Sequence, residues 1–232
     1  MLTPARGIVR FQPASDQSLI IYFGDEITIA AHQQVIRLLR LLETEPVAGI
    51  RNLNPGYCSL LISFDGLHLQ HSDVEEILRP YIQRLDEVRL PEPRKVEIPV
   101  CYGNEYGPDL NDVAAFHGMT AEQVVNLHAS VIYVVYFLGF VPGFAYLGGL
   151  RKELSTPRLP APRPRVPRGS VGIAGEQTGV YPLATPGGWR LIGQTPIDMF
   201  RPEREEMSVL KIGDQVRFMP ISPDKFAALK SQ

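Results

Sequence analysis

The first part of the chain alternates between two hydrophobic periodicities. Residues 7–12 and 18–23 are short apolar runs typical of strands. Between residues 29 and 43 the apolar positions recur every three or four residues, which predicts an amphipathic helix. Thr28 is placed to cap its start, and Pro46 is placed to end it.

A second strand-and-helix group follows the first. Residues 50–53 and 57–64 predict a hairpin around Asn54-Pro55-Gly56, and a helix is expected over residues 73–85, with Pro80 kinking or breaking it. The order ββαββα predicts a small α+β domain over residues 1–90. A short stretch rich in proline and charge (LPEPRK) then marks a boundary with a second domain, residues 91–232.

The second domain has a β-rich pattern. It opens with a strand over residues 96–102 and two short helices, of which the second starts with a Thr120–Gln123 capping box. Beyond Ser130 the chain is a series of short β-like runs separated by glycine and proline, at residues 131–140, 170–175, 179–184, 189–193 and 215–221. Such a series indicates a barrel or a sandwich.

Composition narrows the class of protein. The chain has 232 residues, 44% hydrophobic and 21% charged, and its net charge of -2 argues against a nucleic-acid binder that works by bulk charge. The longest uncharged apolar run, residues 131–141, is shorter than the ~20 residues that cross a bilayer. The first residues (MLTPARGIVRF) lack the apolar core of a secretory signal. With only Cys58 and Cys101 we expect no disulfide framework. Taken together, these features predict a cytoplasmic protein with no membrane or nucleic-acid partner.

Glycine alternates with aromatic residues in FLGFVPGFAYLGGL, residues 137–150. Glycine lets the backbone turn tightly or approach a ligand closely, and Phe140, Phe144 and Tyr146 are candidates for the wall of an apolar pocket. The alternative is a tight turn that leaves a buried strand. Further along, Trp189, the only tryptophan, ends PGGW and either floors a cleft or plugs one end of a barrel.

A basic, proline-rich segment connects these motifs (TPRLPAPRPRVPRGSVGIAG). It carries Arg158, Arg163, Arg165 and Arg168 on a stiff extended path, and arginine matches carboxylate and phosphate oxygens. Three interpretations stay open: a solvated loop, an anion site, and a ligand for a proline-binding domain. The glycines that follow form neither a phosphate-binding loop nor a dinucleotide fingerprint.

The histidines offer one candidate for chemistry. His68 and His71 have no cysteine or acidic cluster beside them, so no metal site is predicted there. His128 ends the capped helix just before the apolar strand, where it is either an acid/base group or a helix-terminal residue.

The motifs FLGFVPGFAYLGGL, TPRLPAPRPRVPRGSVGIAGEQTGVYP and TPGGWRLIGQTP, in this order, resemble the 5-oxoprolinase B-subunit family, also called KipI or allophanate hydrolase subunit 1. The likeness extends to YGNEYGPDLNDVA and to the N-terminal SLIIYFGDEI and NPGYCSLLISF. Two positions depart from the family pattern: Arg168 stands where a small residue is usual, and Asn104 where glycine is usual.

The resemblance implies an α+β fold with a cyclophilin-like β-barrel as second domain. It implies one component, inactive alone, of an enzyme that opens 5-oxoproline to glutamate with ATP and Mg²⁺. Its partners would be the A and C subunits of that enzyme, of which the C subunit has a homologous barrel. Other members of the family inhibit a sporulation histidine kinase, and related sequence occurs in the carboxyltransferase part of biotin-dependent urea carboxylase. Both remain alternatives.

On this hypothesis the residues divide into three groups. His128 would handle protons. Arg163 and Arg165 would bind anions, assisted by Gly169, Ser170 and Gln177. The pocket would be shaped by Phe140, Pro142, Gly143, Phe144, Tyr181, Gly187, Gly188 and Trp189.

Overall fold

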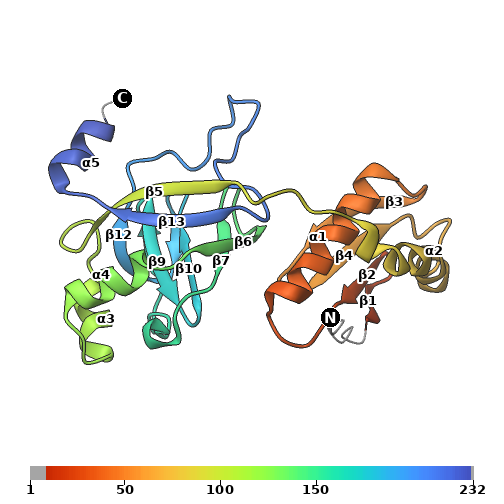
Figure 1. Cartoon of the computed structure of the whole chain (residues 1–232), viewed down its shortest axis with the longest axis horizontal. Helices are drawn as coiled ribbons and strands as arrows, with labels where there is room; N and C mark the ends of the chain where they lie inside the picture. The colour runs from red at the N-terminus through yellow and green to blue at the C-terminus, as the bar shows by residue number, and fades with distance from the viewer. Residues whose placement is uncertain (1–8, 231–232) are drawn as a thin grey trace. The chain divides into compact units, whose positions relative to one another are not determined.

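The computed structural model describes residues 9–230 and divides into two compact units, with the division between Glu92 and Pro93 (Figure 1). Residues 7 and 8 of the first predicted strand lie outside the described residues. The α+β class predicted from the sequence is confirmed. None of the helices in the described part of the chain has the length and apolar character of a membrane span.

The first unit is a four-stranded antiparallel sheet with two helices, in the strand order β1-β2-β4-β3. Its elements are β1 (Arg10–Ser15), β2 (Ser18–Tyr22), α1 (Ile29–Thr44), β3 (Ile50–Pro55), β4 (Ser59–Phe64) and α2 (His71–Gln83), followed by the short η1 (Leu85–Glu87). The predicted ββαββα order is therefore confirmed. Alternate residues of β2 and β4, such as Leu19 and Ile62, are buried in the core that the helices share.

The helices of this unit follow their capping and ending signals, since α1 ends at Thr44 just before Pro46, but the proline inside α2 does not end that helix. Thr28 caps α1 by accepting a hydrogen bond from the backbone N–H of Ala31 at 3.1 Å. Pro80 does not break α2, which continues to Gln83. Pro80 is exposed, so water can satisfy the carbonyl that loses its partner, and the buried Val74 and Leu78 hold the helix to the core.

The second unit is built on a closed seven-stranded barrel with the order β10-β7-β6-β13-β5-β12-β9. All neighbouring strands are antiparallel except β13 and β5. The strands are β5 (Lys95–Tyr102), β6 (Tyr133–Leu138), β7 (Ala145–Gly148), β9 (Ser170–Ala174), β10 (Gln177–Val180), β12 (Arg190–Gln194) and β13 (Gln215–Pro220). Closure removes the exposed edges that an open sheet would leave, and it decides the choice between barrel and sandwich.

Helices α3 (Leu110–Phe116) and α4 (Ala121–Ala129) connect β5 to β6 and pack against each other (Figure 1). The capping box predicted for α4 is present: the Thr120 hydroxyl accepts from the N–H of Gln123, and the Gln123 side chain accepts from the N–H of Thr120. Ahead of α3, Asn104 has a φ of 48°. This left-handed backbone favours glycine and tolerates asparagine, which explains how asparagine fits a position where glycine is usual.

The sequence did not predict five elements of this unit, one of which is the barrel strand β7. Inside the proline-rich segment, β8 (Arg163–Val166) pairs with β11 (Thr185–Gly187) as a two-stranded antiparallel ribbon separate from the barrel. A two-stranded ribbon consists of edge strands, where proline is tolerated. The other two are η2 (Lys152–Leu154) and the C-terminal α5 (Pro223–Lys230).

Candidate functional site

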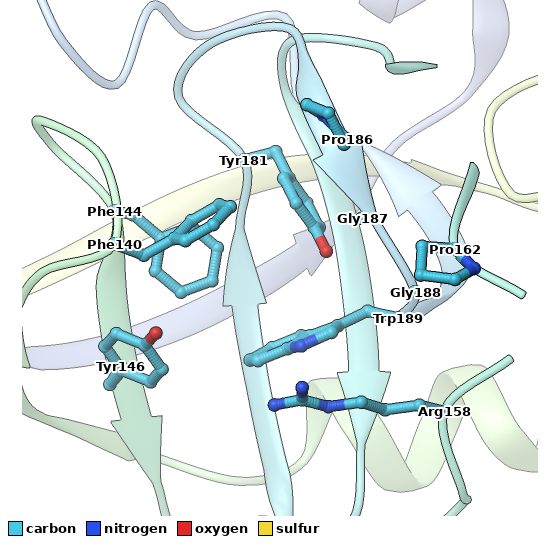
Figure 2. Close-up of a pocket in the computed structure, with 10 residues that line it drawn as sticks. All are labelled: Phe140, Phe144, Tyr146, Arg158, Pro162, Tyr181, Pro186, Gly187, Gly188 and Trp189. Carbon is cyan, nitrogen blue, oxygen red and sulfur yellow. The ribbon is translucent and has the colours of Figure 1, made fainter. Parts of the chain in front are cut away.

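A pocket of about 300 Å³ lies beside the barrel, with walls that are mostly aromatic (Figure 2). One wall comes from the β6–β7 turn and from β7, and contains Phe140, Phe144 and Tyr146. The other wall comes from the connection before β8, the residue that follows β10, strand β11 and the β11–β12 turn. It contains Arg158, Pro162, Tyr181, Pro186, Gly187, Gly188 and Trp189.

Phe144 is the centre of the aromatic cluster. Its ring meets those of Tyr146, Tyr181 and Trp189 edge to face, with centroids 5.0, 5.4 and 5.4 Å away. Such contacts add to the burial of apolar area and fix the orientation of the rings. Phe144 and Trp189 are almost fully buried, whereas Phe140 is 61% exposed. The cluster is therefore a rigid base with a solvent-exposed ring beside it.

Two backbone features shape the walls of the pocket. Phe140 has a φ of 68°, an uncommon conformation for a bulky residue, in the tight β6–β7 turn. A Cβ at Gly187 would lie 2.6 Å from the Tyr181 hydroxyl oxygen, so a larger residue there would displace the tyrosine ring. Gly187 of the PGGW motif thus serves a close approach of backbone to side chain.

Arg158 is the charged side chain among the ten residues that line the pocket. Figure 2 shows it extending alongside the indole ring of Trp189. Burial raises the pKa of Tyr146 and of Tyr181, while the nearby Arg158 cation acts in the opposite direction on both. At neutral pH the pocket therefore combines two neutral phenols with one cation, an arrangement suited to a small ligand with one negative charge.

The structure brings together six of the eight residues predicted to shape a pocket: Phe140, Phe144, Tyr181, Gly187, Gly188 and Trp189. Pro142 and Gly143 lie outside it. Gly143 has a φ of 81°, and its Cα faces Phe200, where an added Cβ would lie 2.6 Å from that residue's Cβ. Its role is to turn the chain.

The arginines expected to bind an anion are placed differently. Arg163 donates to both carboxylate oxygens of Asp109, at 2.7 and 3.0 Å, so its guanidinium is already occupied. Arg165 is exposed on β8, outside the pocket. Arg168 forms an ion pair with Asp198 and lies outside the pocket as well. The sequence identified the basic loop but not Arg158, the residue in it that reaches the pocket, because neither charge nor spacing separates the four.

The backbone groups expected to help hold an anion are also occupied. The N–H of Gly169 donates to the carbonyl of Tyr181 at 2.7 Å, and the N–H of Ser170 donates to that of Pro167 at 3.2 Å. Ser170 is buried in β9, and Gln177, the first residue of the neighbouring strand β10, pairs with Ala174 of β9. These residues build the barrel and do not line the pocket.

His128 belongs to the barrel core, which corrects the interpretation of this residue as a proton carrier. Its side chain is fully buried, its Nδ1 lies 2.8 Å from the Tyr102 hydroxyl, and its Nε2 lies 2.9 Å from the Thr178 hydroxyl. The ring also stacks on Phe218 with centroids 4.7 Å apart. Burial lowers the pKa of His128 to about 3, so the ring is neutral and out of reach of a ligand in the pocket.

Metal-ligating side chains do not gather in the described residues 9–230. There, no group of three or more His, Cys, Asp or Glu side chains is placed to hold an ion. Sequence reasoning missed Pro162 and Pro186, which line the pocket, and Asp109, which accepts bonds from Arg163, because no local signal marks them.

The chain is similar to known proteins along most of its length. The family described as "Carboxyltransferase domain, subdomain C and D" matches residues 9–210. The B subunit of 5-oxoprolinase from Bacillus subtilis (strain 168) is 42% identical, and the match covers 97% of this chain and 98% of that protein. The B subunit of 5-oxoprolinase from Escherichia coli O157:H7 is 44% identical, covering 88% of this chain and 93% of that one.

Among solved structures, that of TTHA0988 superimposes with a TM-score of 0.78 at 37% identity. The match covers 89% of this chain but 40% of TTHA0988, so this chain spans less than half the length of that protein. The resemblance noted in the sequence motifs is therefore confirmed over most of the chain. The protein belongs to the 5-oxoprolinase B-subunit family and carries its carboxyltransferase domain.

Proposed function

We propose that this protein is the B subunit of an ATP-dependent 5-oxoprolinase and that its aromatic pocket binds 5-oxoproline. The names of the two relatives, which it matches along nearly their whole lengths, support the first part of the proposal. The second part rests on the pocket itself.

The observation that carries the proposal is the position of Arg158 beside Trp189 and opposite Tyr146 (Figure 2). 5-Oxoproline is a flat five-membered lactam with one carboxylate. A guanidinium pairs with a carboxylate through two parallel hydrogen bonds, and aromatic faces accept a flat ring. A cavity of about 300 Å³ is at the small end of the range for ligand sites and suits a molecule of this size.

The reaction requires activation of an unreactive lactam carbonyl, which ATP with Mg²⁺ would supply by phosphorylating its oxygen. This chain's proposed part is to bind and orient the carboxylate and the ring. We assign no residue here to ATP or Mg²⁺, and propose that the A and C subunits complete the enzyme. In TTHA0988 the matched region makes up 40% of a longer chain. This arrangement supports a function that needs other protein domains or subunits.

The test is reconstitution. The purified chain is mixed with the A and C subunits of the same source, and release of ADP is measured with and without 5-oxoproline. We expect ATP hydrolysis that depends on 5-oxoproline in the three-protein mixture and none with this chain alone. Folded proteins that together hydrolyse no ATP in response to 5-oxoproline would contradict the proposal. Suppression of histidine kinase autophosphorylation by the isolated chain would then favour the regulatory alternative.

A further inference from the structure

Asp109 stands immediately before α3, yet its side chain makes no capping bond to that helix. Its carboxylate is buried and instead accepts bonds from two distant segments. Arg163 donates to both oxygens, and the backbone N–H of Leu191 donates to Oδ2 at 2.7 Å. One carboxylate thus joins the start of α3, the start of β8 and β12. We call this group the Asp109 clamp.

The two segments that the clamp holds both lead directly into the pocket. Pro162, adjacent to Arg163, lines it, and Trp189 lies two residues before Leu191. Just before these residues in each segment, the backbone N–H of Leu159 donates to the carbonyl of Gly188 at 2.7 Å. This bond fixes the stretch that carries Arg158 against the PGGW turn.

From these contacts we propose that Asp109 and Arg163 are positioning residues for the pocket. Neither residue lines it. They hold the wall formed by Arg158, Pro162 and Trp189 at a fixed distance from the Phe144 wall. Loss of the clamp frees the start of β8, so the Arg158 guanidinium is no longer held beside the indole ring. The inference depends on the proposed function only in taking 5-oxoproline as the ligand.

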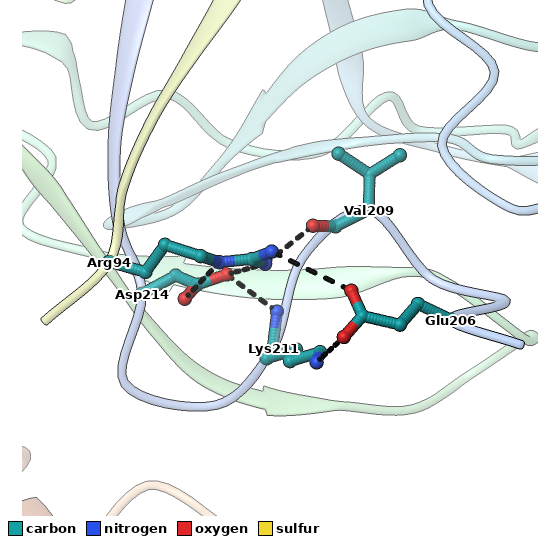
Figure 3. A network of polar contacts seen from close by, with 5 residues as sticks. All are labelled: Arg94, Glu206, Val209, Lys211 and Asp214. Carbon is teal, nitrogen blue, oxygen red and sulfur yellow. Dashed lines mark hydrogen bonds and ion pairs between the residues drawn. The ribbon is translucent and has the colours of Figure 1, made fainter.

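The barrel contains a matched control. Asp214 is as buried as Asp109, with 6% of its side chain exposed against 5%, and it too accepts two bonds from an arginine, Arg94, and one from a backbone N–H, that of Lys211 (Figure 3). None of its members lines the pocket. Asp214→Asn therefore removes the same kind of charge and bonds without touching the wall.

The experiment uses Trp189, the only tryptophan, as a reporter. Acrylamide quenching and the emission wavelength of Trp189 are measured for the wild type, Asp109→Asn and Asp214→Asn without ligand. KM and kcat for 5-oxoproline are then measured with the A and C subunits present. For Asp109→Asn we expect stronger quenching, a red-shifted emission and a KM raised about tenfold with kcat within about twofold, as for lost ligand binding. Asp214→Asn should match the wild type in quenching, emission wavelength, KM and kcat.

Two outcomes would overturn the proposal: a folded Asp109→Asn with wild-type quenching and KM, or equal changes in both variants, which would indicate general loosening. If Asp109→Asn does not fold, Arg163→Lys, which keeps the charge but loses the paired bonds, decides the question by the same measurements. A wild-type mixture without turnover would refute the proposed function, whereas the quenching comparison would still decide the role of the clamp.

Discussion

Two buried aspartates, Asp109 and Asp214, hold their surroundings with the same chemistry. Each accepts a pair of bonds from an arginine and one from a backbone N–H. The Asp214 group joins Arg94, one residue before β5, to the turn that leads into β13, with Glu206 and Lys211 as further partners (Figure 3). It thereby secures the parallel strand pair of the barrel.

The Asp109 clamp lies where the ribbon β8–β11 leaves the barrel, next to Pro162 and Trp189. The difference between the two groups is thus one of position and not of bonding. One serves closure of the barrel, and the other serves the shape of the pocket. Local chemistry alone would not separate them, because it is alike in both.

The largest expected effect tests the likeness of the two groups. Arg163→Ala and Arg94→Ala each leave a buried carboxylate without its cation, which should lower the free energy of unfolding by about 3 kcal/mol. Urea unfolding at pH 7 measures this loss. A loss below about 1 kcal/mol in either variant would show that water compensates the carboxylate, and the two groups would not be equivalent.

The second effect is a pH dependence of stability that comes from His128 in the barrel core, which belongs to neither aspartate group. The pKa of His128 is lowered to about 3 by burial, against about 6.5 for an unfolded histidine. Below pH 6.5 the unfolded chain gains a proton that the folded chain does not. The contribution of His128 to the free energy of unfolding is therefore complete above pH 6.5 and is lost as the pH falls towards 3. Between pH 7 and pH 5 we expect the free energy of unfolding to fall by about 2 kcal/mol from this group.

His128→Gln isolates this contribution, since glutamine does not titrate. The variant should show a smaller loss of unfolding free energy over the same pH range than the wild type. Equal losses would mean that His128 is protonated in the folded barrel.

The third effect concerns the pocket wall that the Asp109 clamp is proposed to hold. Arg158→Gln should raise the KM for 5-oxoproline about tenfold, as expected for one charge-assisted pair at a partly exposed site. Arg165→Gln, an exposed change on β8 outside the pocket, is the control and should leave KM unchanged. Similar values for both variants would remove Arg158 from the site.

The smallest effect is that of a single methyl group. In Gly187→Ala the new Cβ would press on the Tyr181 hydroxyl, so we expect KM to rise about threefold through a small shift of that ring. In Gly188→Ala the nearest atoms, those of Pro162, are 3.8 Å away, and little change is expected. A crystal structure or ligand titration in which the two variants behave alike would contradict the close packing at Gly187.

Much of the fold could be predicted because its signals are local. The capped helices at Thr28 and Thr120 and the alternation in the strands depend on neighbours a few residues apart. The aromatic and glycine motifs also pointed to the pocket, and seven of its lining residues, including Tyr146, were identified from the sequence. The proline-rich segment was harder, because a short ribbon strand that contains proline has no strand-like pattern.

The sequence by itself therefore determined the order of the elements in the first unit, the family and the aromatic character of the pocket. Only the tertiary structure decided that Arg158 reaches the pocket, that Arg163 is held by Asp109, and that His128 is buried. The physical reason is separation along the chain. Asp109 lies 54 residues from Arg163 and 82 from Leu191, and His128 lies 50 residues from Thr178. Which of several like side chains finds such a partner depends on how the barrel closes.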